Sequence, residues 1–285
     1  MTNTPTNTST STNTSTNTAV PPTGTPQPSN TATSTRTSTS MPSVTICACP
    51  TFTPTPLPSP ATNTPEPTAT VCVMQFTDVP LDHTFYAYIH CLACRGIING
   101  YSSGCEIGNP CFRPGNFVTR GQLAKIVSNS AGFSDPAGPQ QFEDVLPNST
   151  FYDFIWRLAS RGIISGYPCG GPGEPCAPPN NLPYFRPNAS ITRGQISKIV
   201  SEAAGFSDPP GAQQFEDVLP GSTFYNFIWR LTDRGIMNGY PCGGPGEPCV
   251  PPNNLPYFRT NSFATRGQTS KIVANTFFPD CQAIR

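Results

Sequence analysis

Charge is scarce in this sequence, and histidine is scarcer still. Charged residues make up 11% of the 285 positions, the formal net charge is zero, and the only histidines are His83 and His90. A neutral chain gives no reason to expect nucleic-acid binding, and two neighbouring histidines cannot complete a recurring Ser-His-Asp set. No run approaches the roughly 18 apolar residues of a membrane helix. We therefore predict that the protein is not an enzyme and has no cofactor, metal, nucleic-acid partner or membrane span.

Residues 1–71 lack any apolar pattern. They are almost entirely Thr, Pro, Ser and Asn, and only Arg36 and Glu66 carry charge. Such a segment cannot bury enough apolar surface to offset the entropy of ordering its backbone, and its prolines favour extended conformations. We predict a disordered linker over 1–71. Met1 is followed by polar residues rather than a basic and then apolar leader, so we interpret the chain as a fragment or mis-started frame of a longer exported protein.

Cysteine, in contrast, is abundant, with 12 residues in the chain. Closely spaced pairs in Gly/Pro-rich loops are unusual in cytosolic proteins, which indicates an oxidising, extracellular compartment. Zinc is the alternative for these pairs, but four ligands would have to converge from different parts of the chain. We predict one disulfide in each loop, pairing Cys105 with Cys111, Cys169 with Cys176, and Cys242 with Cys249.

Cys91 and Cys94 form a C-x-x-C pattern, which can mark a redox motif when it follows a strand. Here the pattern lies within a predicted helix. We therefore expect these two cysteines to pair with Cys72 and Cys281, tying the ends of the folded part to its first helix. Cys47 and Cys49 have no assigned partner and could cross-link chains.

Three tandem copies of one unit follow the linker. Phe76 opens a Phe-x-Asp-Val motif that returns at Phe142 and again at Phe215. Each copy continues with Arg-Gly-Ile, Gly-Tyr, Phe-Arg and Thr-Arg-Gly-Gln in the same order. The second and third copies are longer by a Pro/Gly-rich stretch that can only be loop. We place repeat 1 at 72–134, repeat 2 at 135–207 and repeat 3 at 208–285.

Each repeat is predicted to form a helix, a loop and a second helix. Thr84, Thr150 and Thr223 are the expected caps of the first helices, and Gly96, Gly162 and Gly235 their left-handed stops. Thr-Arg-Gly-Gln is a capping box that opens the second helix. Because one such hairpin cannot bury its own apolar face, the three copies should pack around a shared core. The predicted fold class is mainly α.

The ordered motifs resemble the S-layer homology domain over residues 74–278. The resemblance implies a pseudo-threefold helical bundle that binds cell-wall polysaccharide, often pyruvylated, in grooves between repeats. The family motif Thr-Arg-Ala-Glu appears here with Gly and Gln in its last two positions. Gln keeps the capping role and loses a negative charge. The tryptophan usual near the start of the first helix is missing, and the Phe85-Tyr86 pair stands in its neighbourhood.

Several polar residues recur once per repeat and are candidate glycan ligands. The arginines are predicted to open the second helices, where guanidinium and backbone amides could hold an anion together. The lysines and arginines could instead be solvated faces, the tyrosines core packing, and the aspartates structural caps or partners of an arginine. The candidates are Arg120, Arg193, Arg266, Lys125, Lys198, Lys271, Tyr101, Tyr167, Tyr240, Asp78, Asp144 and Asp217.

The preferred function is non-covalent attachment of a surface protein to the bacterial cell envelope through wall polysaccharide. The expected location is extracellular, at the cell surface and S-layer. The alternatives are a structural protein that self-assembles with other surface-layer subunits, and the non-catalytic tail of a larger exported enzyme.

Overall fold

The structure is a computed structural model that describes residues 72, 74–106 and 108–283. The predicted disordered linker, residues 1–71, lies outside the described residues, and so do Cys47 and Cys49. Within the described part, helices are the only extended regular elements, and strand pairing is limited to isolated bridges. The prediction of a mainly α fold is confirmed. None of these helices has the length and apolar character needed to span a bilayer.

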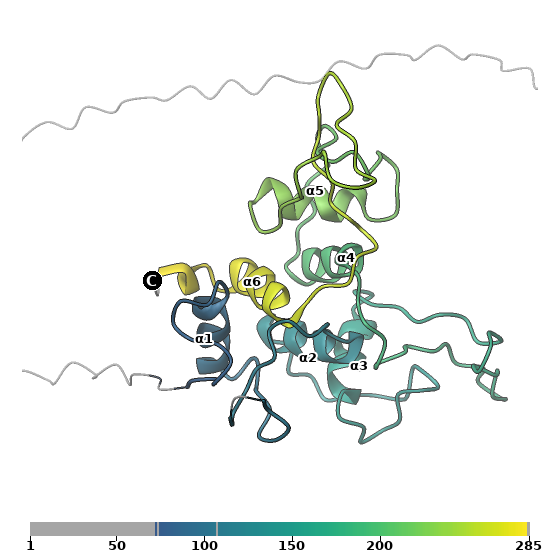
Figure 1. The fold of residues 1–285 in the computed structure, drawn as a ribbon. Helices are drawn as coiled ribbons and strands as arrows, with labels where there is room; N and C mark the ends of the chain where they lie inside the picture. The colour runs from purple at the N-terminus through teal and green to yellow at the C-terminus, as the bar shows by residue number, and fades with distance from the viewer. Residues whose placement is uncertain (1–71, 73, 107, 284–285) are drawn as a thin grey trace, which may run out of the picture. The chain divides into compact units, whose positions relative to one another are not determined.

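Two helices lie in each predicted repeat (Figure 1). The elements in chain order are α1 (Tyr86–Cys94), α2 (Arg120–Ser130), α3 (Tyr152–Ser160), α4 (Arg193–Ala203), α5 (Tyr225–Asp233), α6 (Arg266–Phe277) and the short 3-10 helix η1 (Pro279–Ala283).

The second helix of each repeat begins as predicted. Thr119, Thr192 and Thr265 each accept a hydrogen bond from the amide three residues on, and the glutamine there bonds back to the threonine amide. The glycine after each first helix adopts a positive φ, 69° at Gly96, which confirms the left-handed stop. These signals are local in sequence, so they can be interpreted without knowledge of the tertiary fold.

The predicted threonine caps of the first helices are wrong. The N-cap residues are Phe85, Phe151 and Phe224, one position later than the threonines, and none makes a side-chain cap. In repeat 1 the amide of Phe85 donates to Nδ1 of His83 at 3.1 Å instead. A tight backbone turn precedes the helix in each repeat and already occupies amides that a threonine side chain would cap.

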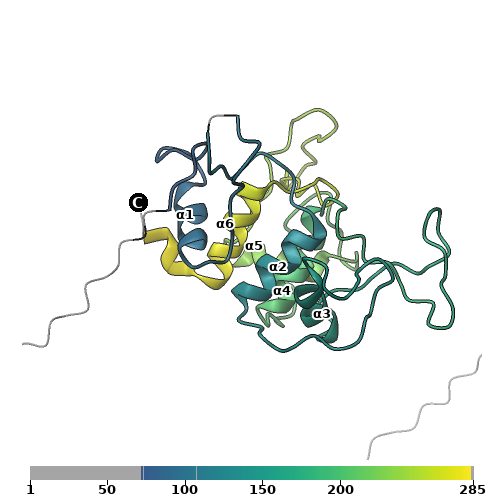
Figure 2. The same cartoon turned by 90° about the horizontal axis from the view of Figure 1, so that it is seen from below.

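The helices pair between repeats rather than within them. The first helix of repeat 2, α3, packs against α2 of repeat 1, and α5 packs against α4 in the same way. The circuit closes because α1 packs against α6, at the other end of the chain. Figures 1 and 2 show α1 beside α6 from two directions. The hairpin predicted within each repeat is therefore not the packing unit, since each repeat contributes its two helices to different pairs.

Three backbone hydrogen bonds join the repeats in a ring just before the second helices. The amide of Val118 donates to the carbonyl of Ala264 at 3.0 Å, and Ala264 donates to Ile191 at 3.2 Å. Ile191 completes the ring by donating to Val118 at 3.1 Å. All three residues are fully buried. Because each repeat gives one bond and receives one, the three repeats relate to one another as in a threefold arrangement.

A single apolar core includes side chains from all three repeats, as predicted. Phe112, Phe185 and Phe258 are its largest fully buried members and occupy one equivalent position per repeat. Each stacks at a tilt on the phenylalanine of the Phe-x-Asp-Val motif, with ring centroids 5.2–5.4 Å apart. The motif therefore folds back onto its own repeat's loop and covers the core there.

Candidate functional site

Two grooves of similar size bring together residues from all three repeats. Groove 1, about 200 Å³, is lined by Tyr101, Gln122, Lys125, Phe151 and Arg266, among others. Groove 2, about 220 Å³, is lined by the equivalent residues Tyr167, Gln195, Lys198, Phe224 and Arg120. In each groove the tyrosine, glutamine and lysine come from one repeat and the phenylalanine from the next repeat along the chain. The arginine comes from the remaining repeat, which is repeat 3 for groove 1 and repeat 1 for groove 2. Of the twelve candidate residues, six meet in these two grooves.

The arginine of each groove is almost completely buried. Arg120 is 7% exposed, and its Nε donates to the carbonyl of Phe185 at 2.7 Å while Nη2 donates to Ser165 at 3.1 Å. Arg266 makes the same pair of bonds to Phe112 and Asn99. Burial lowers the pKa of these guanidinium groups, yet arginine remains a cation at neutral pH. Each arginine therefore joins two repeats through backbone carbonyls and presents its remaining surface to a groove.

The amides at the start of the second helices do not face a ligand, contrary to our prediction. The amides of Arg120 and Gly121 donate to the carbonyls of Ala189 and Pro187 in repeat 2. The amide of Gln122 donates to its capping threonine. With all three donors paired, the helix end has no free amide for an anion, and any anion contact must come from side chains.

The tyrosine of each groove is held between the arginine and the glutamine. The guanidinium carbon of Arg266 lies 5.0 Å from the Tyr101 ring centroid, and that of Arg120 lies 5.2 Å from Tyr167. Nε2 of Gln195 donates to the Tyr167 hydroxyl at 3.2 Å, while its Oε1 accepts from the capping threonine amide. An amide can do both, because it carries a donor and an acceptor. The Gln that stands in the motif thus orients the tyrosine as well as capping the helix.

The glycine of Thr-Arg-Gly-Gln makes room for a phenylalanine. A Cβ placed on Gly121 would lie 2.5 Å from Cδ2 of Phe151, and one on Gly267 would lie 2.4 Å from Cδ2 of Phe85. The aromatic residue that opens each first helix therefore rests directly on the start of another repeat's second helix. This contact explains why glycine and phenylalanine occur together in all three repeats.

The groove lysines are half-buried and have no ionic partner among the described residues. Nζ of Lys125 lies 5.8 Å from the centroid of the Phe154 ring. An ammonium group without a carboxylate neighbour can offer its charge to a ligand at little cost. The groove arginines donate to backbone carbonyls, whereas the groove lysines form no ion pair among the described residues. The lysines are therefore the better candidates to bind an anion.

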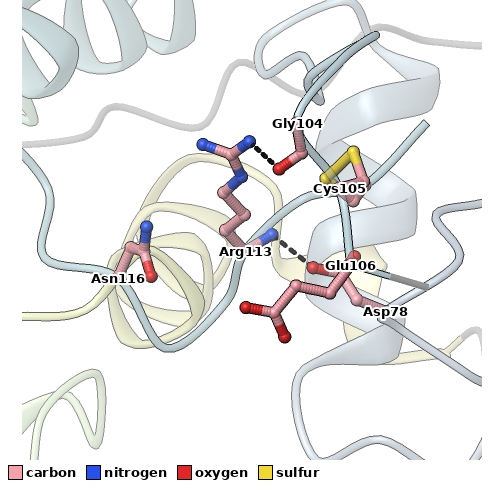
Figure 3. Close-up of a pocket in the computed structure, with 7 residues that line it drawn as sticks. Asp78, Gly104, Cys105, Glu106, Arg113 and Asn116 are labelled. Atoms are coloured by element: carbon pink, nitrogen blue, oxygen red, sulfur yellow. Dashed lines mark hydrogen bonds between the residues drawn. A yellow bond between two sulfur atoms is a disulfide. The ribbon is translucent and has the colours of Figure 1, made fainter. Parts of the chain in front are cut away.

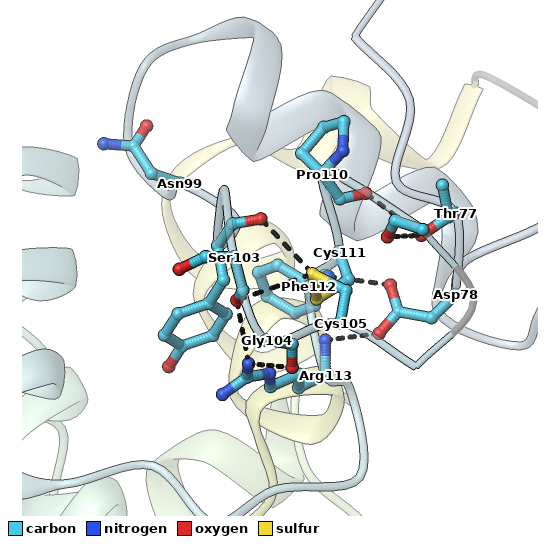
Figure 4. The surroundings of a disulfide bond; sticks show 12 residues. Thr77, Asp78, Asn99, Ser103, Gly104, Cys105, Pro110, Cys111, Phe112 and Arg113 are labelled. Atoms are coloured by element: carbon cyan, nitrogen blue, oxygen red, sulfur yellow. Dashed lines mark hydrogen bonds between the residues drawn. A yellow bond between two sulfur atoms is a disulfide. The ribbon is translucent and has the colours of Figure 1, made fainter.

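The three aspartates lie outside the grooves and hold the loops. Asp78 accepts hydrogen bonds from the amides of Phe112 and Arg113 at 2.7 and 2.6 Å, and Asp144 and Asp217 repeat this arrangement. The loop arginine has a positive φ of 60°, a conformation that the two bonds hold in place. This geometry favours the structural interpretation of the aspartates. Figure 4 shows the Asp78 carboxylate hydrogen-bonded to the loop beside the Cys105–Cys111 disulfide.

Five disulfides lie among the described residues: the three loop pairs are as predicted, and Cys91 and Cys94 pair with Cys72 and Cys281 as expected, although the sequence left open which joins which. The loop pairs are Cys105–Cys111, Cys169–Cys176 and Cys242–Cys249. The remaining two join Cys72 to Cys94 and Cys91 to Cys281, so α1 is tied both to the chain that enters it and to η1.

Comparison with known proteins bears directly on these repeats. The model of the S-layer homology domain matches residues 75–124 and 141–196. Both segments are S-layer homology domains. Residues of this chain are 28% identical over 170 positions to Cell surface glycoprotein 1 of Acetivibrio thermocellus, and 24% identical over 159 positions to the Surface-layer 125 kDa protein of Lysinibacillus sphaericus. These alignments cover 52% and 55% of this chain but only 6% and 12% of the two relatives.

Repeat 3 lies beyond the matched segments and has the same local geometry as the two S-layer homology domains. Its α6 begins with the same capping box. Arg193 donates from Nε to Phe258 and from Nη2 to Asn238, both at 2.8 Å. Its guanidinium carbon lies 5.2 Å from the Tyr240 ring centroid. The buried arginine beside a tyrosine, as in grooves 1 and 2, is therefore repeated by Arg193 and Tyr240. Lys271 on α6 occupies the position equivalent to Lys125 and Lys198.

The loops of the three repeats differ in one ionic contact that was not predicted from the sequence. Arg186 forms a two-pronged salt bridge with Glu174, with N–O distances of 2.6 and 2.8 Å, and Arg259 pairs likewise with Glu247. Among the described residues of the shorter loop in repeat 1, Arg113 has no such carboxylate partner. Arg113 there donates to the carbonyls of Ser103 and Gly104 and borders a cavity of about 390 Å³ (Figure 3). The Gly-Glu-Pro-Cys motif in the two longer loops was the available signal.

These salt bridges predict a specific acid sensitivity. Hydrogen bonding from Arg186 lowers the pKa of the Glu174 carboxyl, and Arg259 does the same for Glu247. A depressed pKa contributes stability that is present above the unfolded pKa and is lost as pH falls through the folded one. We expect the thermal midpoint to drop from pH about 5 downward, through the ordinary glutamate pKa of about 4.3. Melting curves of Glu174→Gln/Glu247→Gln should show a smaller drop; an identical drop would contradict the assignment.

Proposed function

We propose that this chain attaches a surface protein to the bacterial cell envelope by binding wall polysaccharide in grooves 1 and 2. The S-layer homology domains support an anchoring role at the cell surface, as do the names of the two surface-protein relatives. On this proposal repeat 3 is a third domain of the same family. Residues 1–71 then link the anchor to whatever it carries.

The main observation behind the proposal is that the two grooves are lined by equivalent residues. Each combines a lysine with no ionic partner in the described part of the chain, a tyrosine ring held in a fixed orientation, and a buried arginine at its edge. A cation beside a half-buried aromatic ring suits a sugar that carries an acid, because an aromatic ring packs on apolar CH groups while the ammonium meets the carboxylate. A pyruvyl group on the glycan supplies such an acid. The same arrangement offers no acid–base pair for hydrolysis.

Replacing the groove lysines should weaken glycan binding without unfolding the protein. A hydrogen bond to a charged group contributes about 1.5–3 kcal/mol, so Lys125→Ala or Lys198→Ala should reduce affinity about tenfold or more at its own groove. The double variant Lys125→Ala/Lys198→Ala should lose more than either single one. Titration of purified wall glycan against each variant measures this, with melting curves recorded alongside.

The matched control is Arg95→Ala, which removes one positive charge from outside both grooves, where Arg95 pairs with Asp280. This variant should bind glycan as the wild type does. Equal affinity of the wild type and the double lysine variant would remove both grooves from the binding site. If the wild type instead binds no glycan and associates with copies of itself, the self-assembling alternative is the correct one.

A further inference from the structure

Repeat 1 contains a cluster of metal-ligating side chains that the grooves do not use. Cys72 and Cys94 form a disulfide, and both ring nitrogens of His90 lie within 3.8 Å of Cys94 Sγ, Nε2 at 3.7 Å. The two sulfurs and a ring nitrogen all lie within 4.8 Å of one another. Each side chain is half-buried, so a small solute can reach it. Within the described part of the chain, this is the only cluster of three or more such side chains.

Comparison among the repeats shows that this cluster is a coordinated departure from the common pattern. The equivalent positions are Gly138, Trp156 and Ser160 in repeat 2, and Gly211, Trp229 and Asp233 in repeat 3.

The glycine and the tryptophan of those repeats depend on each other. A Cβ on Gly138 would lie 2.7 Å from Cζ2 of Trp156, so no larger residue fits while the indole is present. Cys72 can therefore stand at the glycine position only because His90 has replaced the indole. Cys72 thus depends on the absence of the indole at position 90, where a histidine stands, and a third ligand-forming residue, Cys94, lies one helical turn after His90.

We propose that reduction of the Cys72–Cys94 disulfide opens a site for one thiophilic cation, with Zn²⁺ as the reference ion. The ligands are the thiolates of Cys72 and Cys94 and one ring nitrogen of His90, and water completes a tetrahedron. Zinc–sulfur and zinc–nitrogen bonds of about 2.3 and 2.0–2.1 Å place sulfur and nitrogen about 3.6 Å apart in a tetrahedron. The present distance of 3.7 Å between Cys94 Sγ and Nε2 already matches this value.

The chemistry balances with a small-molecule thiol as the reductant. Two thiols give up two electrons and two protons to the protein disulfide, which yields one small-molecule disulfide and two cysteine thiols. Binding of the cation then displaces the two thiol protons. The disulfide itself is no ligand, because only the thiolate binds these metals. The oxidised state thus ties residue 72 to α1 covalently, and the reduced state ties it through the metal.

The second disulfide of α1 is protected from the same reductant. Cys91 and Cys281 are 1% and 0% exposed, in contrast to the half-buried Cys72 and Cys94. A mild thiol should therefore open Cys72–Cys94 while Cys91–Cys281 keeps α1 attached to η1. The loop disulfides can also be reduced, but those cysteines have no histidine beside them.

The test uses the full chain carrying Cys47→Ser/Cys49→Ser, so that the linker thiols contribute nothing. After anaerobic treatment with reduced glutathione, alkylation and peptide mapping should find Cys72 and Cys94 free. Competition with a chromophoric chelator should then give one Zn²⁺ per chain, and Co²⁺ should give thiolate charge-transfer bands. His90→Ala should bind Zn²⁺ at least about 100-fold more weakly, the upper end of what loss of an outer-shell partner costs. Cys169→Ser/Cys176→Ser should bind it unchanged.

Three results would overturn the proposal: Cys72 and Cys94 that stay paired in the thiol, equal zinc uptake by oxidised and reduced protein, or undiminished uptake by His90→Ala. Melting curves of oxidised His90→Ala guard against misfolding. If that variant is unfolded, His90→Gln provides the same comparison, since an amide side chain keeps a polar group there and is a poor ligand for zinc.

Discussion

Arg193→Ala should destabilise the protein by about 3 kcal/mol or more, because two charged hydrogen bonds to backbone carbonyls disappear together. The side chain is 6% exposed, and its acceptors, Phe258 and Asn238, both belong to repeat 3. Loss of the guanidinium leaves these carbonyls without that partner at a junction between repeats. Arg193→Lys should recover only part of the loss, since an ammonium cannot reach both carbonyls with the same planar fork. Denaturant unfolding of the three proteins measures the difference.

The comparison that isolates burial is Arg259→Ala. Arg259 also belongs to a triplet of equivalent arginines, but it is exposed and pairs with Glu247 at the surface. Surface pairs contribute about 0–1 kcal/mol, so this variant should unfold near the wild type. The expectation drawn from sequence was different: an anion held by the guanidinium together with the backbone amides at the start of the helix, which would make Arg193 a ligand contact. An Arg193→Ala protein that is as stable as wild type and binds less glycan would favour that interpretation.

Removing the disulfide between Cys91 and Cys281 should have the largest effect of any single covalent change. The two residues are 190 positions apart. Restricting the unfolded chain over a loop of that length stabilises the folded state by about 5 kcal/mol in the chain-entropy treatment. The Cys91→Ser/Cys281→Ser variant should therefore show a much lower denaturation midpoint. Unfolding should begin with separation of α1 and η1, since this bond connects them.

The internal control is Cys105→Ser/Cys111→Ser, which opens a loop of only six positions. The same treatment gives about 2 kcal/mol for so short a loop. Equal destabilisation by the two double variants would mean that loop length does not determine the stabilisation, and that local packing around each bond does.

The features that could be predicted from sequence are those set by neighbouring residues. A capping box needs only a threonine and a glutamine three positions apart, and a helix stop needs only a glycine that tolerates positive φ. The helix pairing could not be predicted this way. The first helices α3 and α5 bury equivalent residues, so the sequence does not indicate whether each packs on its own repeat's second helix or on that of another. That choice depends on the path of the intervening loop.

The burial of the arginines at the start of the second helices could not be predicted from the sequence for a related reason. The motif places Arg120 at the first turn of a helix, where such residues are commonly exposed. The carbonyls that bury it, from Ser165 and Phe185, belong to a different repeat. No local pattern reports an acceptor 45 or 65 positions away. The lysines were recognised as recurring, but their lack of an ionic partner became apparent only from the three-dimensional arrangement.

The closed circuit of helix pairs limits how this region can change in copy number during evolution. In an open-ended array, each new unit stacks on the last, so single units can be gained or lost. Here α6 already packs on α1, and a fourth unit would find no uncovered partner. Loss of one unit would leave two helices without their neighbours. Gain or loss of a single unit would therefore break the circuit of helix pairs, so we expect such regions to be duplicated or lost as sets of three.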